Sequence, residues 1–178
     1  MTIFARDGFH AASTRAIATA AAVNQALINY HFATKQGLYL AVFASIAEQI
    51  DARIGPLLSA IESAPVGDPA DARVRAFEHL MQLVGGLLRL MALDASTAWA
   101  QLILREQQAP TRAFALLYDG FMGRVFALLT HLVLQLAPDR DAQQARLLVV
   151  TIIGQVMVFR AARAGVLRQL GWSQIGPD

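Results

Sequence analysis

STRAIATAAAVNQ, residues 13–25, is the stretch that decides how this chain begins to fold. Ser13 is suited to cap a helix that runs to about Ala21, because a serine at an N-cap accepts a hydrogen bond from a backbone N–H of the first turn. Residues 22–24 then form a turn, and another helix follows over about 25–31. Two short helices joined by so short a turn cross steeply, which requires a small residue, Ala18, where they touch. The stretch therefore predicts a helix-turn-helix.

The motif has an inner side, and its second helix has an outer side that is left free. The apolar residues that recur at inward-facing spacings are Ile17, Ala21, Val23, Ile28 and Phe32. The residues left on or near the outer side are Asn24, Gln25, Asn29, Tyr30 and His31. A helix of this kind enters the major groove of DNA, where Gln and Asn side chains form paired hydrogen bonds with adenine edges.

The remaining chain also has its apolar residues at helical spacing, so we predict an all-α fold. Gly8 is expected to end a short first helix. Thr34 is expected to cap a long helix that runs to about Arg53, before Gly55-Pro56 breaks the chain. Residues 64–69 are linker-like. Further helices are predicted from Pro69 to about Leu93, from Ser96 to before Pro110, from Thr111 to before Pro138, and from Asp141 to about Arg163, with Gly165 beyond the last.

The composition indicates a surface or cavity that hides apolar residues. Of the 178 residues 56% are hydrophobic, and the mean hydropathy of +0.43 is high for a soluble monomer. A membrane, a partner subunit or a ligand cavity would account for this surplus. The most apolar stretch, Leu147–Phe159, is only 13 residues long and contains Gln155, whereas a spanning helix needs about 20 residues. We therefore expect a subunit interface, a ligand pocket or both, and no membrane.

Several other classes of function are disfavoured. The net charge is only +2, and the absence of cysteine excludes disulfides, zinc-thiolate sites and thiol nucleophiles. No secretion leader opens the chain, which predicts a cytoplasmic protein. His10, His31, His79 and His131 lack the close spacing of a metal site. No catalytic triad, carboxylate pair or glycine-rich phosphate loop is evident, so we expect neither an enzyme nor a cofactor.

Residues 1–47 resemble the DNA-binding domain of the TetR family of repressors. The matching residues are Gly8-Phe9, Ser13-Thr14-Arg15, Ile17-Ala18, Val23-Asn24, the run from Tyr30 to Lys35, and Leu38. The resemblance implies that Gln25, Ala26 and Leu27 face bases and that Arg15 faces a base or a phosphate. It also implies that the phosphate backbone is held by Thr14, Asn29, Tyr30, His31 and Lys35.

Lys35 adds a physical argument. A cation in the first turn of a helix costs roughly 0.3–1 kcal/mol against the helix dipole, and a docked phosphate would reverse that cost. A solvated lysine is the alternative.

Three departures from the family pattern affect this reading. Ala22 stands where glycine is usual in the turn, which would cost on the order of 1 kcal/mol if this residue has a positive φ. Asn29 stands where tyrosine is usual. The first helix is short, with Ile3 and Phe4 as its apolar anchors, and family members normally carry one or two dozen residues before the position of Met1. From this truncated first helix we expect weak DNA binding and early hydrogen exchange in residues 1–32.

Residues 48–178 are expected to form a second domain for effector binding and dimerisation. They resemble the YbiH/CecR branch of the family in the run from Arg105 to Thr111 and in Phe114, Tyr118 and Phe121. The apolar candidates for an effector pocket are Trp99, Leu102, Phe114, Tyr118 and Met122. The polar candidates are His79, Gln101, Arg105 and Thr111. The expected effector is apolar or aromatic, with an anionic group facing Arg105.

Other interpretations of these residues stay open. The aromatic residues also fit a plain core. Arg105-Glu106 also fits a solvated pair, or a cap for the helix after Pro110. His131 fits a position on a helix flank.

For the dimer, the two long apolar helices over about 112–136 and 141–163 are the candidates. Paired across a two-fold axis, they would give a four-helix interface. Gly154 would allow close approach there, and the residues expected around it are Leu147, Val150, Thr151, Met157 and Val158. The alternative is that both helices belong to the core of one subunit.

Taken together, these features predict an effector-responsive transcriptional repressor. It would bind an inverted-repeat operator in double-stranded DNA as a homodimer, and a small apolar or aromatic ligand would release it. The alternative is an all-helical ligand-binding or dimerisation module that has lost DNA binding.

Overall fold

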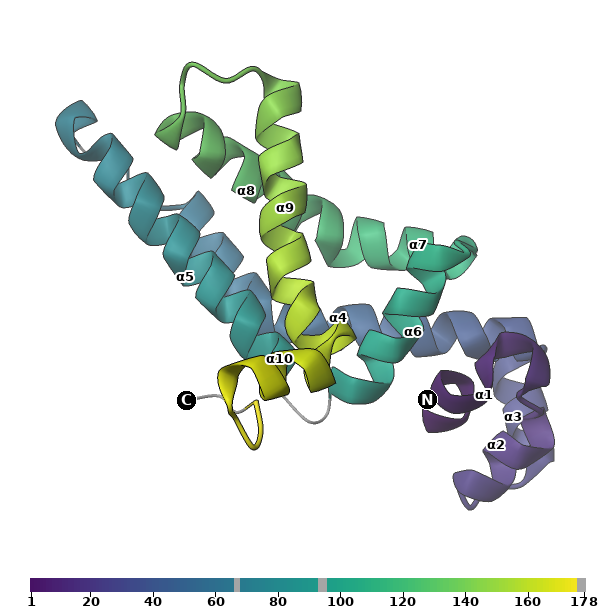
Figure 1. The fold of residues 1–178 in the computed structure, drawn as a ribbon. Helices are drawn as coiled ribbons and strands as arrows, with labels where there is room; N and C mark the ends of the chain where they lie inside the picture. The colour runs from purple at the N-terminus through teal and green to yellow at the C-terminus, as the bar shows by residue number, and fades with distance from the viewer. Residues whose placement is uncertain (66–67, 93–95, 176–178) are drawn as a thin grey trace. The chain divides into compact units, whose positions relative to one another are not determined.

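The computed structural model describes residues 1–65, 68–92 and 96–175, and every regular element among them is helical, as predicted. The N-terminal helices are α1 (Thr2–Ala11), α2 (Thr14–Ala20), α3 (Gln25–Phe32) and α4 (Lys35–Glu62). A short 3₁₀ helix, η1 (Pro69–Asp71), precedes α5 (Ala72–Ala92) and α6 (Ser96–Gln108). The remaining elements are α7 (Arg112–Leu117), the π-helical η2 (Tyr118–Met122), α8 (Gly123–Leu136), α9 (Ala142–Ala161) and α10 (Arg163–Leu170) (Figure 1). Residues 66–67 of the predicted linker and the predicted helix end at Leu93 lie outside the described residues.

The helix starts follow the capping residues that the sequence places there. The Ser13 hydroxyl accepts a hydrogen bond from the Ala16 N–H at 3.0 Å, and Thr34 accepts one from the Gly37 N–H at 2.9 Å. Asp141 forms a capping box with Gln144 at the start of α9. Each of these bonds satisfies a backbone N–H that has no partner within its helix.

The predicted chain break at Gly55-Pro56 is wrong, because α4 continues through it to Glu62. A proline inside a helix removes one backbone hydrogen bond. Here the apolar residues on both sides of Pro56 keep a helical spacing and stay buried, namely Ile50, Ile54, Leu58 and Ile61. The burial of this continuous stripe outweighs the missing bond.

Two other predicted helices also differ from the structure. α1 continues past Gly8, which forms a kink with φ 77° rather than a stop. The single helix predicted after Thr111 is divided by the π-helical η2. The helix predicted from Asp141 to about Arg163 is α9, which ends at Ala161, and Gly165 lies beyond its end as predicted. Gly165 belongs to a further helix, α10, which Gly171 closes in the left-handed conformation.

The chain forms two compact units. Unit 1 comprises Met1–Gln49 and Ala95–Gly120, and unit 2 comprises Ile50–Asp94 and Phe121–Asp178. The two consecutive domains predicted from the sequence, 1–47 and 48–178, differ from these units because α6 packs on α1 in unit 1. The functional division at residue 47 stays a prediction.

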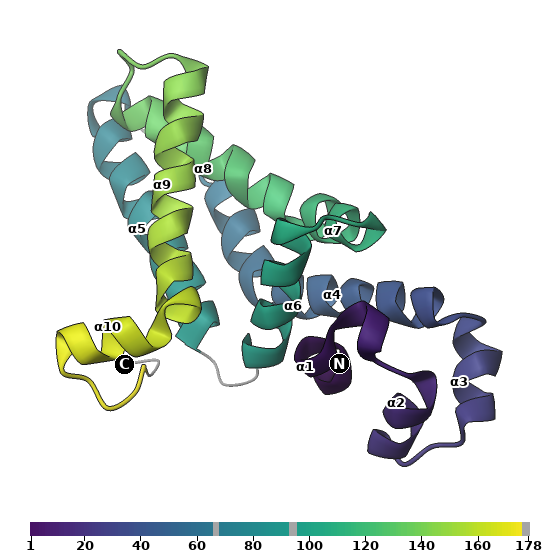
Figure 2. The same ribbon diagram turned by 45° about the vertical axis from the view of Figure 1, so that its right-hand side comes forward.

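The core of unit 2 lies among α5, α8 and α9, which pack against one another (Figures 1 and 2). Leu83, Leu129 and Val149 are fully buried there. Gly86 allows α5 to approach α4 closely, because a Cβ at this position would lie 2.9 Å from a methyl carbon of Leu57.

Two helical stretches are longer than the 13-residue apolar segment on which the expectation of no membrane was based. Arg112–Leu136 and Ala142–Ala161, with mean hydropathies of 1.3 and 1.4, are long and apolar enough to cross a membrane by length and composition alone. Part of this hydropathy serves the core of unit 2, where Leu132 of α8 and Val156 of α9 are buried. Another part lies on an exposed face of α9 that is described below.

Candidate nucleic-acid interface

The helix-turn-helix is formed by α2, α3 and the turn at residues 21–24 (Figures 1 and 2). Ala18 is buried at the contact, as predicted, and its carbonyl accepts a hydrogen bond from the Val23 N–H at 3.0 Å. Ala22 has φ 54°, in the left-handed region. An alanine in this conformation costs about 1 kcal/mol relative to glycine.

The inward-facing residues of the motif are only partly as predicted. Ile28 is buried, and Ile17 and Phe32 are half-buried. Ala21 and Val23 are exposed, Val23 to 42%. Both lie in the turn after α2 ends at Ala20, so the helical spacing that assigned them to the inner side no longer applies.

The outer surface of α3 carries most of the predicted DNA contacts. The exposed residues of this eight-residue helix are Gln25, Ala26, Leu27, Asn29, Tyr30 and His31. Tyr30 is 84% exposed, and its ring lies edge-on to that of His31, with the centroids 5.3 Å apart. The three predicted base-facing residues therefore share the first turn of α3, and the two rings lie further along the helix.

Two predicted contacts lie on α2, next to the start of α3. Arg15 is exposed and Thr14 is half-buried. The Gln25 amide donates a hydrogen bond to the Thr14 hydroxyl at 3.1 Å, which joins a predicted base contact to a predicted phosphate contact. This bond orients the Gln25 side chain before any DNA arrives.

Lys35 is not a free cation at the start of α4. Its ammonium donates to the carbonyls of His10 at 3.1 Å and Ala12 at 3.0 Å, and it lies 4.7 Å from the centre of the Phe9 ring. These carbonyls mark the C-terminal end of α1, where a cation is favourable. Lys35 therefore needs no phosphate to offset the dipole of α4, because the end of α1 already stabilises its charge.

The short helix α1 is held by α4 and α6. Phe4 is 1% exposed, and its ring packs edge-on against Tyr39 with the centroids 5.0 Å apart. The Arg105 guanidinium donates to the carbonyl of Arg6 at 3.3 Å. The sequence predicted Phe4 as an anchor, but it did not reveal that α6 covers α1.

Glu106 is a buried carboxylate whose role the sequence left open. It is 3% exposed and accepts hydrogen bonds from the Tyr39 hydroxyl at 3.0 Å and from the Thr111 N–H and hydroxyl at 2.9 Å each. Thr111 is the N-cap of α7, and Glu106 is its partner. The reading of an N-cap partner for the helix after Pro110 therefore holds for Glu106 and not for Arg105, which donates to the carbonyl of Arg6. Burial, together with the hydrogen bond to Glu106, raises the pKa of the Tyr39 phenol.

The residues predicted to bind an effector are divided between the two units, and their common site stays a prediction. His79 and Met122 belong to unit 2, and the other seven belong to unit 1. In unit 1, Trp99 and Leu102 are buried in the core, and Arg105 contacts α1. Phe114 is half-buried, and the residues exposed at the surface are Gln101, Thr111 and Tyr118.

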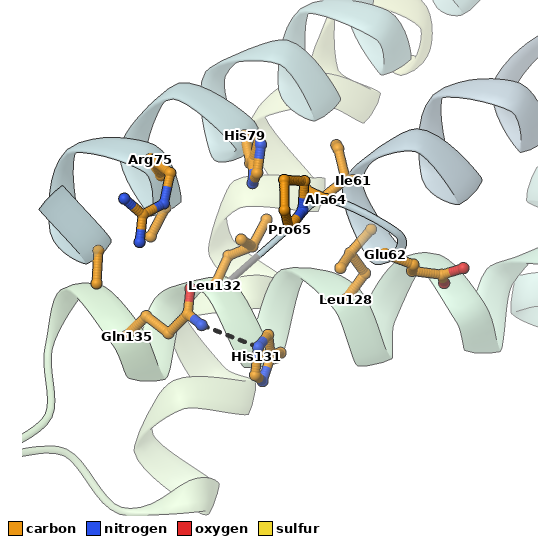
Figure 3. Close-up of a pocket in the computed structure, with 12 residues that line it drawn as sticks. Ile61, Glu62, Ala64, Pro65, Arg75, His79, Leu128, His131, Leu132 and Gln135 are labelled. Carbon is orange, nitrogen blue, oxygen red and sulfur yellow. Dashed lines mark hydrogen bonds between the residues drawn. The ribbon is translucent and has the colours of Figure 1, made fainter. Parts of the chain in front are cut away.

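Unit 2 contains a pocket with a volume of about 590 Å³ between the end of α4, the start of α5 and α8 (Figure 3). Its lining residues are Ile61, Glu62, Ala64, Pro65, Ala72, Arg75, Ala76, His79, Leu128, His131, Leu132 and Gln135. Of the predicted effector residues, only His79 lines it. His131, which the sequence analysis placed on a helix flank, also lines this pocket. Its position between two leucines of α8 that are buried, Leu128 and Leu132, was the signal that could have assigned it to the pocket.

The predicted dimer residues form an exposed stripe on α9. Leu147, Val150 and Val158 are 61%, 59% and 40% exposed. Thr151 and Gly154 are exposed on the same side, whereas Met157 is half-buried. A Cβ built on Gly154 meets nothing within 4 Å, so this glycine is not needed for packing within the described chain.

Comparison with known proteins places the N-terminal and the C-terminal part of the chain in one family. Residues 1–42 match the model of bacterial regulatory proteins of the tetR family, and residues 76–178 match the C-terminal domain of the HTH-type transcriptional dual regulator CecR. The CecR regulator of Shigella flexneri is 29% identical over 164 residues, which cover 91% of this chain and 73% of the relative. The chain therefore belongs to the TetR family of DNA-binding transcriptional regulators and carries a C-terminal domain of the CecR type.

Proposed function

We propose that this regulator is a dimeric repressor that inserts α3 into the major groove of an inverted-repeat operator and is released by a small organic molecule. The observation that carries the proposal is the outer surface of α3, where six of eight residues are exposed while Ile28 anchors the helix inside. Gln25 at its first turn has the amide chemistry that reads adenine edges. As a bacterial regulator of transcription, the protein would act in the cytoplasm, and regulation rather than catalysis would be its role.

Hydrogen bonds, more than net charge, would hold the phosphate backbone. Residues 1–47 contain three basic residues, Arg6, Arg15 and Lys35, against Asp7. Arg6 is paired with Asp7 at 2.6 Å, and Lys35 is bonded to the end of α1. Arg15 and the polar groups of Thr14, Asn29, Tyr30 and His31 would then supply the phosphate contacts. Because few cations replace counterions, the salt dependence of binding should be shallow.

Two recognition helices are needed to read enough bases, and the α9 stripe would bring two subunits together. Its apolar residues are exposed at adjacent turns of one helix, which is costly unless they are covered. A second copy of the stripe across a two-fold axis would cover them.

The proposed function is tested by fluorescence anisotropy with the duplex that lies upstream of the protein's own gene. We expect saturable binding by the full chain, and binding to a scrambled duplex of the same composition that is at least about a thousandfold weaker. Equal affinity for both duplexes would overturn the proposal and favour the alternative of a helical module that no longer recognises DNA.

A further inference from the structure

The pocket of unit 2 has a buried apolar floor and a polar rim. The floor consists of Ile61, Ala76, Leu128 and Leu132, which are 7%, 1%, 8% and 2% exposed. At the rim, Arg75 and His79 come from α5 and His131 and Gln135 come from α8 (Figure 3). A volume of about 590 Å³ lies within the range of small-molecule sites.

The rim is rich in hydrogen-bond donors and includes one permanent cation. Arg75 donates one N–H to the carbonyl of Asp68 at 2.9 Å and, in the part of the chain that the structure describes, forms no ion pair. Its guanidinium has further N–H groups for a ligand. Each imidazole adds at least one N–H. The Nε2 atom of His131 lies 3.0 Å from the amide nitrogen of Gln135.

The acidic residue of the lining does not compete for these donors. Glu62 forms an ion pair with Arg124 at 2.6 Å, and its carboxylate points away from Arg75 and His79 (Figure 3). The hydrogen bonds from Arg124 lower the pKa of the Glu62 carboxyl. The charge of Glu62 is thus neutralised within unit 2, and the rim keeps a net excess of positive charge and donors.

From these observations we infer that the pocket binds an organic carboxylate with an apolar body. The body fills the floor, and the carboxylate lies at the rim, where Arg75 forms the two-pronged contact that suits a planar carboxylate and His79 donates a further hydrogen bond. This inference replaces Arg105, which is bonded to α1 in unit 1, as the partner of the ligand's anionic group. It deepens the proposed release by a small molecule and rests on that function only for the response of DNA binding.

Isothermal titration calorimetry of the full chain without DNA tests the binding. The probes are octanoate, phenylacetate and benzoate, each compared with its primary amide, which has the same body and no charge. We expect at least one carboxylate to bind about tenfold or more tightly than its amide. Equal affinity within every pair, or no binding of any carboxylate, would overturn the inference.

Matched variants locate the site. Arg75→Gln should weaken the carboxylate about tenfold and leave the affinity of the amide unchanged. Arg73→Gln is the control, because Arg73 lies on the same turn of α5 and also donates to a backbone carbonyl, that of Leu136, at 2.9 Å, but it does not line the pocket. An equal loss in both variants would place the ligand elsewhere. Circular dichroism of both variants checks that each one is folded.

Failure of this inference and failure of the proposed function give different results. A chain that binds carboxylates but no specific duplex would support the site and overturn the regulator proposal. A chain that binds its operator but shows no preference for any carboxylate over its amide would do the reverse. If both hold, adding the bound carboxylate to the protein–DNA complex should lower the DNA affinity in the wild type and in Arg73→Gln.

Discussion

Lys35 joins the beginning of α4 to the end of α1 through two hydrogen bonds to the carbonyls of His10 and Ala12. Hydrogen bonds that involve a charged group contribute about 1.5–3 kcal/mol each. We therefore expect Lys35→Met to lower the free energy of unfolding by about that amount or more. The slope of log affinity for DNA against log salt should stay unchanged, since the ammonium is bound within the chain.

Urea denaturation and salt titrations of Lys35→Met measure these two effects. The sequence-based expectation was the opposite, a phosphate contact whose loss flattens the salt dependence. A slope reduced by about one with unaltered stability would restore that reading and contradict ours.

Ala22 is a strained residue whose replacement should stabilise the protein. With φ 54° it adopts a conformation that glycine reaches without cost. Ala22→Gly should therefore raise the free energy of unfolding by up to about 1 kcal/mol. The control is Ala52→Gly at an exposed position in the middle of α4. This change should lower the free energy of unfolding by roughly 0.5–1 kcal/mol. Equal destabilisation by both changes, measured in urea, would show that Ala22 is unstrained.

Tyr39 should make the stability of the protein sensitive to alkaline pH. Its pKa is raised by burial and by the hydrogen bond to Glu106, so folding favours the protonated phenol. Such a group contributes its full stability below the unfolded pKa of about 10 and loses it as the pH rises above that value. The wild type should lose stability above about pH 10 more steeply than Tyr39→Phe. Tyr30→Phe, on the exposed side of α3, is the control, and an identical pH dependence in all three proteins would contradict the account.

At the scale of the element, α9 presents the surface that we assign to the dimer. Gly154→Glu introduces a charge at the centre of the stripe without a clash inside the described chain, because a Cβ there meets nothing within 4 Å. We expect this variant to be a folded monomer by light scattering. Gly165→Glu in α10 is the matched control, since a Cβ there also meets nothing within 4 Å, and it should stay dimeric. A dimeric Gly154→Glu protein would place the interface elsewhere.

How well each element could be predicted depends on how local its signals are. Ser13, Thr34 and Asp141 start helices through hydrogen bonds to residues three positions away, so the sequence reveals them directly. The continuation of α4 through Pro56 depends instead on burial against other helices. Propensity near a proline cannot anticipate such burial.

The same distinction applies to the candidate sites at the scale of the whole molecule. The exposed side of α3 was predictable because both the spacing of its apolar residues and the residues of the family motif lie within a few helical turns of the sequence. The pocket of unit 2 combines residues from α4, α5 and α8 that are up to 74 positions apart in the sequence, from Ile61 to Gln135. Likewise, the burial of Trp99 and the hydrogen bond from Arg105 to the carbonyl of Arg6 accompany the packing of α6 on α1, which joins segments about 100 positions apart. Such placements follow from tertiary packing, which a single sequence does not display.

The central claim is that the whole molecule recognises DNA through α3, with Gln25 as a base-reading residue. Selection of bound duplexes from a randomised pool, with the wild type and Gln25→Ala in parallel, tests it most directly. We predict that the wild type enriches an inverted repeat, and that Gln25→Ala changes the base preference at one symmetric pair of positions while the spacing of the half-sites stays the same. Enrichment of no common sequence by the wild type, or an identical base preference in the two proteins, would contradict the account.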